Sequence, residues 1–380
     1  MRQPSAFATS FALAVLFALA CPSASAQSAS PKSANHWQLH LSVDVLHDSN
    51  VLDLSSSDRA QVNDPLRADR QGLESADDWI MGPDLELTWS RNLLKRKATS
   101  VTAGWDGALY AANTRLNHHD WSFAVDQELC KKRRATSSRV GMTLRRSPDV
   151  TLKRIIDDDE SLAQGVVVRA DQEYDQDGLI LDGRVELVKE RLALDLDVSR
   201  RWRDYIATLN ERDGTLDEWQ ASLVGYPADH WRLRGTYGQG HYDAVGDNLA
   251  TPLAEDDLTS DRETLGLSAR FEWGKKGAKQ RVQAGWESET REFAASNPYD
   301  FYHYGRSDTL TTWGFSWRRG LPHDLAIEVA IADAGNSSSY AQPPPTPNPA
   351  EDETGYSTTV IGASVSWRPD LERSRPRKER

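Results

Sequence analysis

Apolar and polar residues alternate one by one in segment after segment of this chain. Residues 192–198 (LALDLDV) put leucine and valine on one face of an extended chain and Asp195 and Asp197 on the other. Successive side chains of a strand point to opposite faces, so the segment predicts a strand with one apolar and one acidic face. In a helix the same leucines and acids would be scattered around the whole circumference.

The same period recurs from one end of the chain to the other and predicts fourteen strands. An even number is typical of a single-chain bacterial barrel. The predicted strands are residues 37–45, 84–89, 101–109, 121–128, 140–145, 179–187, 192–198, 218–223, 231–237, 265–273, 281–287, 312–317, 324–331 and 361–367.

Short and long connections follow one another between these strands. The pattern predicts short periplasmic turns, with both chain ends on the periplasmic side, and longer polar loops outside the cell. Several short turns are rich in Lys and Arg, which suits either anionic lipid headgroups or ordinary solvated turns. The short connections are residues 92–97, 131–134, 189–191, 227–229, 275–278 and 319–323, and the long ones include 48–78, 152–176, 241–260, 297–306 and 337–353.

One segment leaves two interpretations open. Residues 166–168 are three valines, apolar enough for a strand, but a further strand would break the parity of short and long connections. We therefore predict that residues 165–175 belong to a long external loop.

The pattern favours an all-β fold, a closed antiparallel transmembrane β-barrel with up-and-down topology. A soluble β-sandwich also alternates and is the main rival. Strands of ten or more residues suit a tilted crossing of the membrane, and closure leaves no sheet edge unsatisfied in lipid. Tryptophans close to the short turns fit an interfacial girdle, namely Trp37, Trp89, Trp231, Trp273, Trp317 and Trp367.

The N-terminus has the features of an export signal. Arg2 gives a positive start, residues 11–20 form an unbroken apolar run, and residues 24–26 (ASA) give a small-residue cleavage site. Cys21 leaves a lipoprotein cleavage site as the alternative. The expected division is a signal peptide at residues 1–26, a periplasmic segment at 27–35, the barrel at 36–368 and a basic periplasmic tail at 369–380, in the outer membrane of a Gram-negative cell envelope.

Composition narrows the partners. A net charge of −12 argues against nucleic acid. The 13 tryptophans suit a chain that meets a membrane interface. Expected partners are outer-membrane lipid and the barrel-assembly machinery, with polysaccharide or cell-envelope proteins as candidates. Without Cys21, only Cys130 remains, so an internal disulfide is not expected and this thiol is interpreted as incidental.

Enzyme motifs are absent from the sequence. It contains no Gly-x-Ser-x-Gly and no His-Glu-x-x-His, so we expect neither catalytic residues nor metal ligands nor a cofactor.

The polar faces of the strands instead predict a charged barrel interior. Fourteen strands enclose more space than side chains alone fill, so water, a loop or a substrate must occupy it. Opposed charged walls would create a transverse field that orients polar solutes; the alternative is that the charges only form salt bridges with one another. The expected acidic wall is Asp44, Glu86, Asp106, Asp126, Glu128, Asp195 and Asp197, the expected basic wall is Arg232, Arg234, Arg270 and Arg281, and an expected ion-pair network adds Asp182, Arg184 and Glu186.

The first predicted strand ends in Asp48-Ser49-Asn50-Val51. This motif resembles the opening of outer-membrane barrels associated with exopolysaccharide export and surface-lipoprotein assembly, and the repeated barrel layout extends the resemblance across the mature chain. The chain departs from these barrels by lacking a helical-repeat domain between Ala26 and His36 and by continuing past Trp367 with a basic tail. No functional residue is carried over from them.

Three functions are compatible with these features. The first is a pore for passage or export of polar solutes or polysaccharide. The second is a non-conducting scaffold or assembly barrel for surface components. The third, an enzyme acting on lipid, needs a Ser/His/Asp arrangement at the lipid face that the sequence does not provide.

Overall fold

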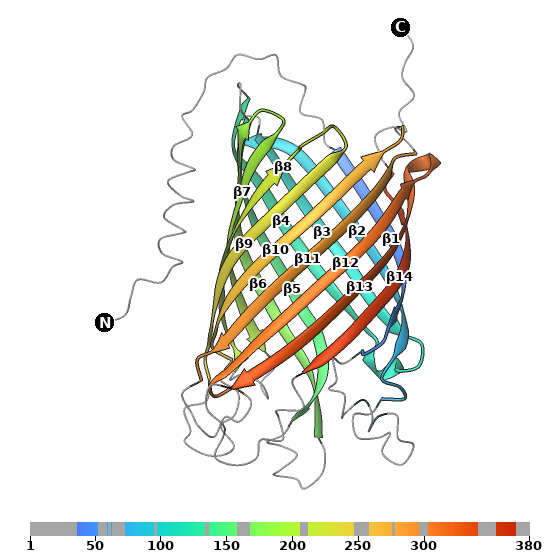
Figure 1. Ribbon diagram of the computed structural model, residues 1–380, viewed down its shortest axis with the longest axis vertical. Helices are drawn as coiled ribbons and strands as arrows, with labels where there is room; N and C mark the ends of the chain where they lie inside the picture. The colour runs from blue at the N-terminus through green and yellow to red at the C-terminus, as the bar shows by residue number, and fades with distance from the viewer. Residues whose placement is uncertain are drawn as a thin grey trace, which may run out of the picture.

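The computed structural model is a closed barrel of antiparallel strands (Figure 1). It describes residues 36–51, 59, 62, 73–94, 97–133, 137–157, 168–205, 212–246, 258–275, 278–295, 303–340 and 355–369. The expected signal peptide, the segment 27–35 and residues 370–380 of the expected tail lie outside the described residues.

Fourteen strands form the barrel, as predicted. They are β1 (His36–Asp48), β2 (Asp78–Leu94), β3 (Lys97–Tyr110), β4 (His118–Arg133), β5 (Ser137–Asp157), β6 (Val168–Val188), β7 (Leu192–Tyr205), β8 (Gly214–Gly225), β9 (Trp231–Ala244), β10 (Ser260–Trp273), β11 (Gln280–Phe293), β12 (Arg306–Gly320), β13 (Leu325–Tyr340) and β14 (Tyr356–Trp367). Two single turns of 3₁₀ helix, Thr114–Leu116 and Pro322–Asp324, complete the described elements.

Each strand pairs with its neighbours in the sequence, and the ring closes where β1 pairs with β14. Val43 of β1, for example, lies directly opposite Pro83 of β2 and Val365 of β14. Closure leaves no free sheet edge, so the backbone groups of every strand find partners within the ring. The predicted closed antiparallel topology is confirmed.

The two ends of the barrel differ. β2 ends and β3 begins at one end of the barrel, as do β6 and β7, with few residues between them in the sequence; we call this the short-turn end, which is uppermost in Figure 1. β1 ends and β2 begins at the opposite end, as do β9 and β10, with long stretches of sequence between them; we call this the long-loop end. β1 begins and β14 ends at the short-turn end, as an even strand count requires.

The outward face is apolar on every strand. Residues directly opposite each other across a strand pair share a face, so Trp286 and Trp313 of neighbouring strands both point outward. In water such large exposed side chains would cost about 25 cal/mol per Å² of apolar surface. One outward residue from each strand, in chain order, illustrates the belt, and each is at least 37% exposed: Val43, Leu85, Val101, Phe123, Leu144, Leu187, Leu194, Leu223, Leu233, Leu267, Trp286, Phe315, Val329 and Val365.

The belt therefore faces hydrocarbon, and the barrel spans a membrane. Within the described residues, no helix combines the length and the apolar character that a membrane crossing needs.

Tryptophan marks both borders of the belt. Trp37 and Trp89 lie near the short-turn end with ring centroids 6.5 Å apart. The expectation that tryptophans lie near strand ends is incomplete, because Trp219, Trp286 and Trp313 lie in the middle of their strands. These strands continue past the belt on the long-loop side, so their midpoints reach the second membrane interface.

A charged pair shows where the hydrocarbon ends. Arg200 of β7 and Asp217 of β8 both point outward near the long-loop border of the belt, with Nη2 and Oδ2 2.6 Å apart, and Trp202 of β7 follows on the same face. Charges on the lipid face are tolerated only near an interface.

β5 and β6 extend farther than predicted. Residues 152–176 were expected to be a loop, yet β5 continues to Asp157 and β6 begins at Val168. The external-loop prediction for residues 165–175 is therefore wrong from Val168 onward. Short and long connections still alternate, because this stretch extends β6 and does not form an additional strand. Two register shifts, after Ser147 and after Thr151, interrupt the pairing there.

The Asp48-Ser49-Asn50-Val51 motif joins β1 to β14 at the long-loop end. The Asp48 carboxylate accepts hydrogen bonds from the Asn50 backbone N–H (2.8 Å) and the Thr358 hydroxyl (2.6 Å). The Asn50 side chain donates to the Ser357 carbonyl at 3.2 Å. Val51 is buried in a small apolar cluster with Val62, Leu73 and Ala76, against Tyr110 and Leu116.

Candidate functional site: the barrel interior

The first four strands line one side of the interior with carboxylates. Alternation puts every second residue of β1–β4 on the face opposite the lipid, and on this face none of the described side chains is Lys or Arg. We call this the acidic wall. It holds the expected Asp44, Glu86, Asp106, Asp126 and Glu128, together with Asp48, Asp78, Asp84 and Asp120.

Three aspartates of the acidic wall stand side by side. Asp106 lies directly opposite Asp84 on one side and Asp120 on the other. Like charges in directly opposite positions destabilise a sheet. His40 approaches Asp84 with Nδ1 and Oδ1 3.5 Å apart. Asp126 is held by the Thr143 hydroxyl at 2.5 Å.

Arginines line the other side of the interior, on β9–β12. Arg232 lies directly opposite Arg270, and Arg281 directly opposite Arg318. We call this the basic wall. It holds the expected Arg232, Arg234, Arg270 and Arg281, together with Arg262, Arg291, Arg306 and Arg318.

Acids on the basic wall form local ion pairs. Glu328 of β13 lies 3.2 Å from Arg281 and 3.5 Å from Arg318. Glu272 pairs with Arg270 and with Lys279. These acids are fewer than the arginines around them, so this side keeps its positive sign.

Asp195 departs from its expected place in the acidic wall. On β7 it lies between Arg184 (3.2 Å) and Arg234 (3.4 Å). Asp182 pairs with Arg139 at 2.8 Å, and Asp197 lies directly opposite Asp182. The strands between the two walls thus carry a mixed network.

Glu186, expected in the ion-pair network, lies at the short-turn end of β6. Its carboxylate accepts a hydrogen bond from the Glu190 backbone N–H at 2.6 Å, which ties β6 to the following turn.

The ion pairs of the interior are short-range. The ion pairs described for inward-facing residues join side chains of one strand or of strands at most two places apart in the ring, and one joins Glu272 to Lys279 in the turn after β10. β1–β4 lie about half the ring away from β8–β11, and in Figure 1 β9–β12 stand in front of β2–β4. The two walls therefore face each other without neutralising each other.

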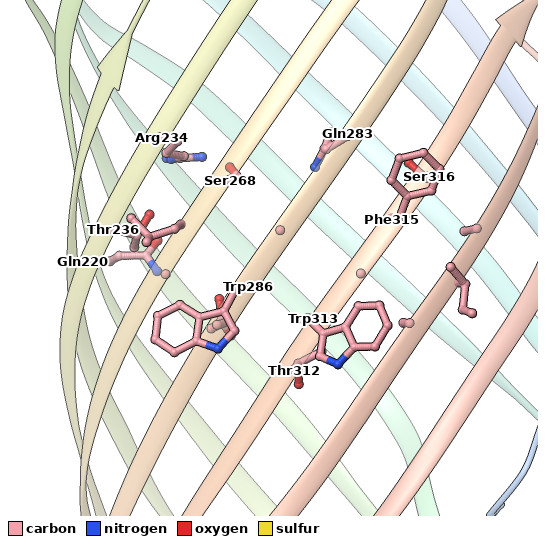
Figure 2. Close-up of a pocket in the computed structure, with 18 residues that line it drawn as sticks. Gln220, Arg234, Thr236, Ser268, Gln283, Trp286, Thr312, Trp313, Phe315 and Ser316 are labelled. Atoms are coloured by element: carbon pink, nitrogen blue, oxygen red, sulfur yellow. The ribbon is translucent and has the colours of Figure 1, made fainter.

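A hollow of about 540 Å³ opens in the wall of β8–β13 (Figure 2). Its depth follows from the sequence, because the inward positions at its centre are glycine or alanine. Trp286, Trp313 and Phe315 of the same strands belong to the outward face. The small residues are Gly266, Gly285, Gly314, Ala330 and Ala332, and the polar ones are Gln220, Arg234, Thr236, Ser268, Gln283, Glu287, Thr312 and Ser316.

Amide, hydroxyl and guanidinium groups thus surround the hollow. They offer donors and acceptors to a hydroxylated or charged solute. In the part of the chain that the structure describes, no group of three or more His, Cys, Asp or Glu is placed to hold a metal ion.

Several charged residues of the interior were missed from the sequence. Asp84 lies within a predicted strand on its polar face. Arg262 and Arg306 lie beyond the predicted strands, where the apolar half of the alternation has ended. If the alternation of inward and outward residues had been continued along each strand beyond the apolar belt, these charged residues would have been assigned to the inward face.

No protein-family model and no curated protein sequence matches this chain. Solved structures do match. A bacterial polysaccharide outer membrane secretin is 11% identical, with 86% of this chain and 98% of that chain covered and a TM-score of 0.40. An anion-selective porin from Comamonas acidovorans is 9% identical, with 89% and 100% covered and a TM-score of 0.40. OprD from Pseudomonas aeruginosa is 11% identical, with 89% and 97% covered and a TM-score of 0.37.

At such identities the likeness concerns the fold alone. The expected resemblance to outer-membrane barrels, one of them a polysaccharide secretin, is found at that level. An even-stranded closed barrel with an apolar belt, tryptophan at both borders and a polar interior is the architecture of bacterial outer-membrane proteins. The chain is an outer-membrane β-barrel with a channel-like fold.

Proposed function

We propose that this protein is a pore for the passage or export of polar solutes or polysaccharide across the outer membrane. One observation carries the proposal: the described interior has an acidic wall and a basic wall on different strands, and the ion pairs described there join near neighbours. A barrel interior that served only packing would cancel such charges locally, since unpaired charges in a dry interior are costly. Water between the walls removes that cost.

The same arrangement suits transport. Opposed charges create a field across the lumen, which orients a polar solute while many weak contacts replace its water. The hollow beside Arg234 widens the lumen on the basic side and adds the Gln220 and Gln283 amides. Weak, repeated contacts let a solute enter and leave, whereas a single tight site would hold it.

A non-conducting scaffold or assembly barrel is the second candidate. The cluster formed by Val51, Val62, Leu73 and Ala76 builds a small folded surface at the long-loop end, where a surface component could dock. This candidate has polysaccharide or cell-envelope proteins as partners and requires that they co-purify with the barrel.

Conductance in planar lipid bilayers separates the two candidates. We expect the mature protein, folded in detergent and inserted into a bilayer, to give stepwise ionic currents. Arg232→Ala combined with Arg234→Ala should shift selectivity toward cations, because the acidic wall then dominates. At about 10 Å in a water-like dielectric each charge acts on an ion with ~0.4 kcal/mol and with opposite sign on cations and anions, so their permeability ratio should change about fourfold per arginine.

Arg200→Ala is the matched control, because Arg200 points outward and its removal changes the net charge without touching the lumen. Folding of each variant is checked by heat-modifiable mobility in gels. A correctly folded barrel that never conducts would refute the pore and favour the scaffold.

A further inference from the structure

The basic wall ends in a group of arginines near the long-loop mouth. Arg262 is the third residue of β10 and lies directly opposite Arg291, close to the end of β11. Arg203 lies close to the end of β7. All three point inward, and Arg291 and Arg203 both repel the charge of Arg262. We call these three residues the outer arginine cluster.

Aromatic rings hold Arg203 in place. Its guanidinium carbon lies 5.2 Å from the centre of the Tyr174 ring and 5.5 Å from that of the Tyr242 ring. Its Nε donates to Gln176 Oε1 at 3.4 Å. Both tyrosines are buried, so cation–π contacts fix this charge in the wall in advance of any ligand.

Each of the two acids that attract Arg262 is already paired with an arginine other than Arg262, in one case with Arg291 of the cluster itself. Glu289 lies 3.0 Å from Arg291, and Glu218 lies 3.3 Å from Arg201. These two carboxylates are also the ones that attract Arg262 electrostatically.

Arg262 itself has no such pairing. Across the described residues, no hydrogen bond or ion pair holds it, and its Nε is buried without an acceptor, as is the Nε of Arg291.

Such an arrangement costs stability in the empty protein. Two like charges in directly opposite positions repel, and a buried donor without an acceptor loses its hydration. Local costs of this kind are typical of functional sites. A bound anion would offset this destabilisation, since guanidinium groups match the planar geometry of carboxylate and the oxygens of phosphate.

We infer that the outer arginine cluster binds an oxyanion, a carboxylate or a phosphate, at the long-loop mouth of the lumen. Arg203 and Arg291 contribute positive charge, and Arg262 supplies guanidinium donors that the protein leaves unused. The anion comes either from a free small ion or from an acidic sugar. The site goes beyond the proposed pore, because binding at the mouth does not depend on conduction.

Titration calorimetry on the mature barrel in detergent tests the site. The probes are inorganic phosphate, glucuronate and, as the uncharged match of glucuronate, glucose. We expect at least one of the two anions to bind and glucose not to bind. Arg262→Gln should weaken the anion at least about tenfold, the loss typical of one charge-assisted hydrogen bond. Arg262→Lys keeps the charge but not the planar donors. Its affinity for the anion should lie between that of the unaltered protein and that of Arg262→Gln.

Arg200→Gln is the matched control: an arginine on the same end of the barrel with the same change in net charge, but directed outward. It should bind like the unaltered protein. Phosphate binding without glucuronate binding identifies a free ion as the source, and glucuronate binding identifies an acidic sugar. The inference is overturned if neither anion binds the folded barrel, if glucose binds equally well, or if Arg262→Gln binds as tightly as Arg200→Gln. Failure of conductance alone would leave it standing.

Discussion

Asn50 is fully buried although its side chain is an amide, and its contacts explain why. The amide donates across the closing seam to Ser357, and the backbone N–H of Asn50 is taken by Asp48. A buried polar group is stable only when its hydrogen bonds are made, so Asn50 specifies one arrangement of β1 against β14. The motif that resembles export barrels thus has a structural role here, in closing the ring.

Replacing Asn50 tests this role at the level of a single residue. Asn50→Ala removes the donor and leaves the Ser357 carbonyl without it, so the free energy of unfolding should fall by about 1–3 kcal/mol. Urea unfolding of the barrel in detergent, followed by tryptophan fluorescence, measures the change. Ser339→Ala is the control, since that exposed hydroxyl makes only a 3.5 Å contact with the Ser307 carbonyl. Equal midpoints for both variants would show that the seam does not depend on Asn50.

The strands of this barrel can be predicted where contact with lipid requires apolar residues on the outward face. Beyond the apolar belt this requirement ends, and the strand cannot be predicted from alternation. In β7 the alternation from Leu192 to Val198 matches the apolar belt, and the strand was found from it. In β5 and β6 the strands continue beyond the belt, where Arg146 forms ion pairs with Asp175 and Asp177, and no lipid-facing apolar residues mark an alternation there. Alternation therefore predicted the number and order of the strands and which of their residues point inward, but it underestimated the length of the strands.

Side-chain contacts in the interior depend on information that alternation lacks. The sequence predicts that Asp195 and Arg234 point inward, but their ion pair depends on the stagger between β7 and β9. That stagger is fixed by ring closure, which no single strand encodes. The two charged walls can be predicted from which residues point inward. The ion pairs of the mixed network between the walls cannot, because they also depend on the stagger of the strands.

A glycine in β14 tests how tightly neighbouring strands meet. A Cβ on Gly362 would overlap Leu46 Cδ2 and lie 3.0 Å from the Val45 carbonyl oxygen of β1. Gly362→Ala should therefore open the β1–β14 seam and cost about 1–3 kcal/mol through overpacking. Gly225→Ala at the end of β8 is the matched control, because a Cβ there meets no atom within 4 Å. Thermal loss of heat-modifiable gel mobility compares them, and equal transitions would contradict the tight seam.

Charge at the scale of the whole molecule is divided between the two sides of the interior. The acidic wall on β1–β4 and the basic wall on β9–β12 come from distant parts of the chain and meet only because the ring closes. The net charge of −12 does not reveal this division. Selectivity of the proposed pore should depend on the balance of the two walls rather than on the total.

Neutralising part of the acidic wall tests that balance. Asp84→Asn combined with Asp106→Asn should move the reversal potential toward anion selectivity, opposite to the effect of removing Arg232 and Arg234. The shift should shrink as salt rises from 0.1 M to 1 M, because the screening length falls from about 10 Å to about 3 Å. Asp217→Asn, an outward-facing carboxylate, should leave the potential unchanged. A shift of the same sign for both walls would contradict a transverse field.

We propose that the polar face of the strands lines a water-filled, conducting interior, whereas the apolar face meets lipid. The most direct measurement is single-channel current before and after a charged methanethiosulfonate reagent reacts with one introduced thiol, in protein carrying Cys130→Ser. Ser268→Cys is placed beside the hollow, and Ala269→Cys, the next residue of β10, is placed on the lipid face. We predict that the reagent lowers the current through the Ser268 variant and leaves the Ala269 variant unchanged. Absence of current, or an equal response at both positions, would contradict the account.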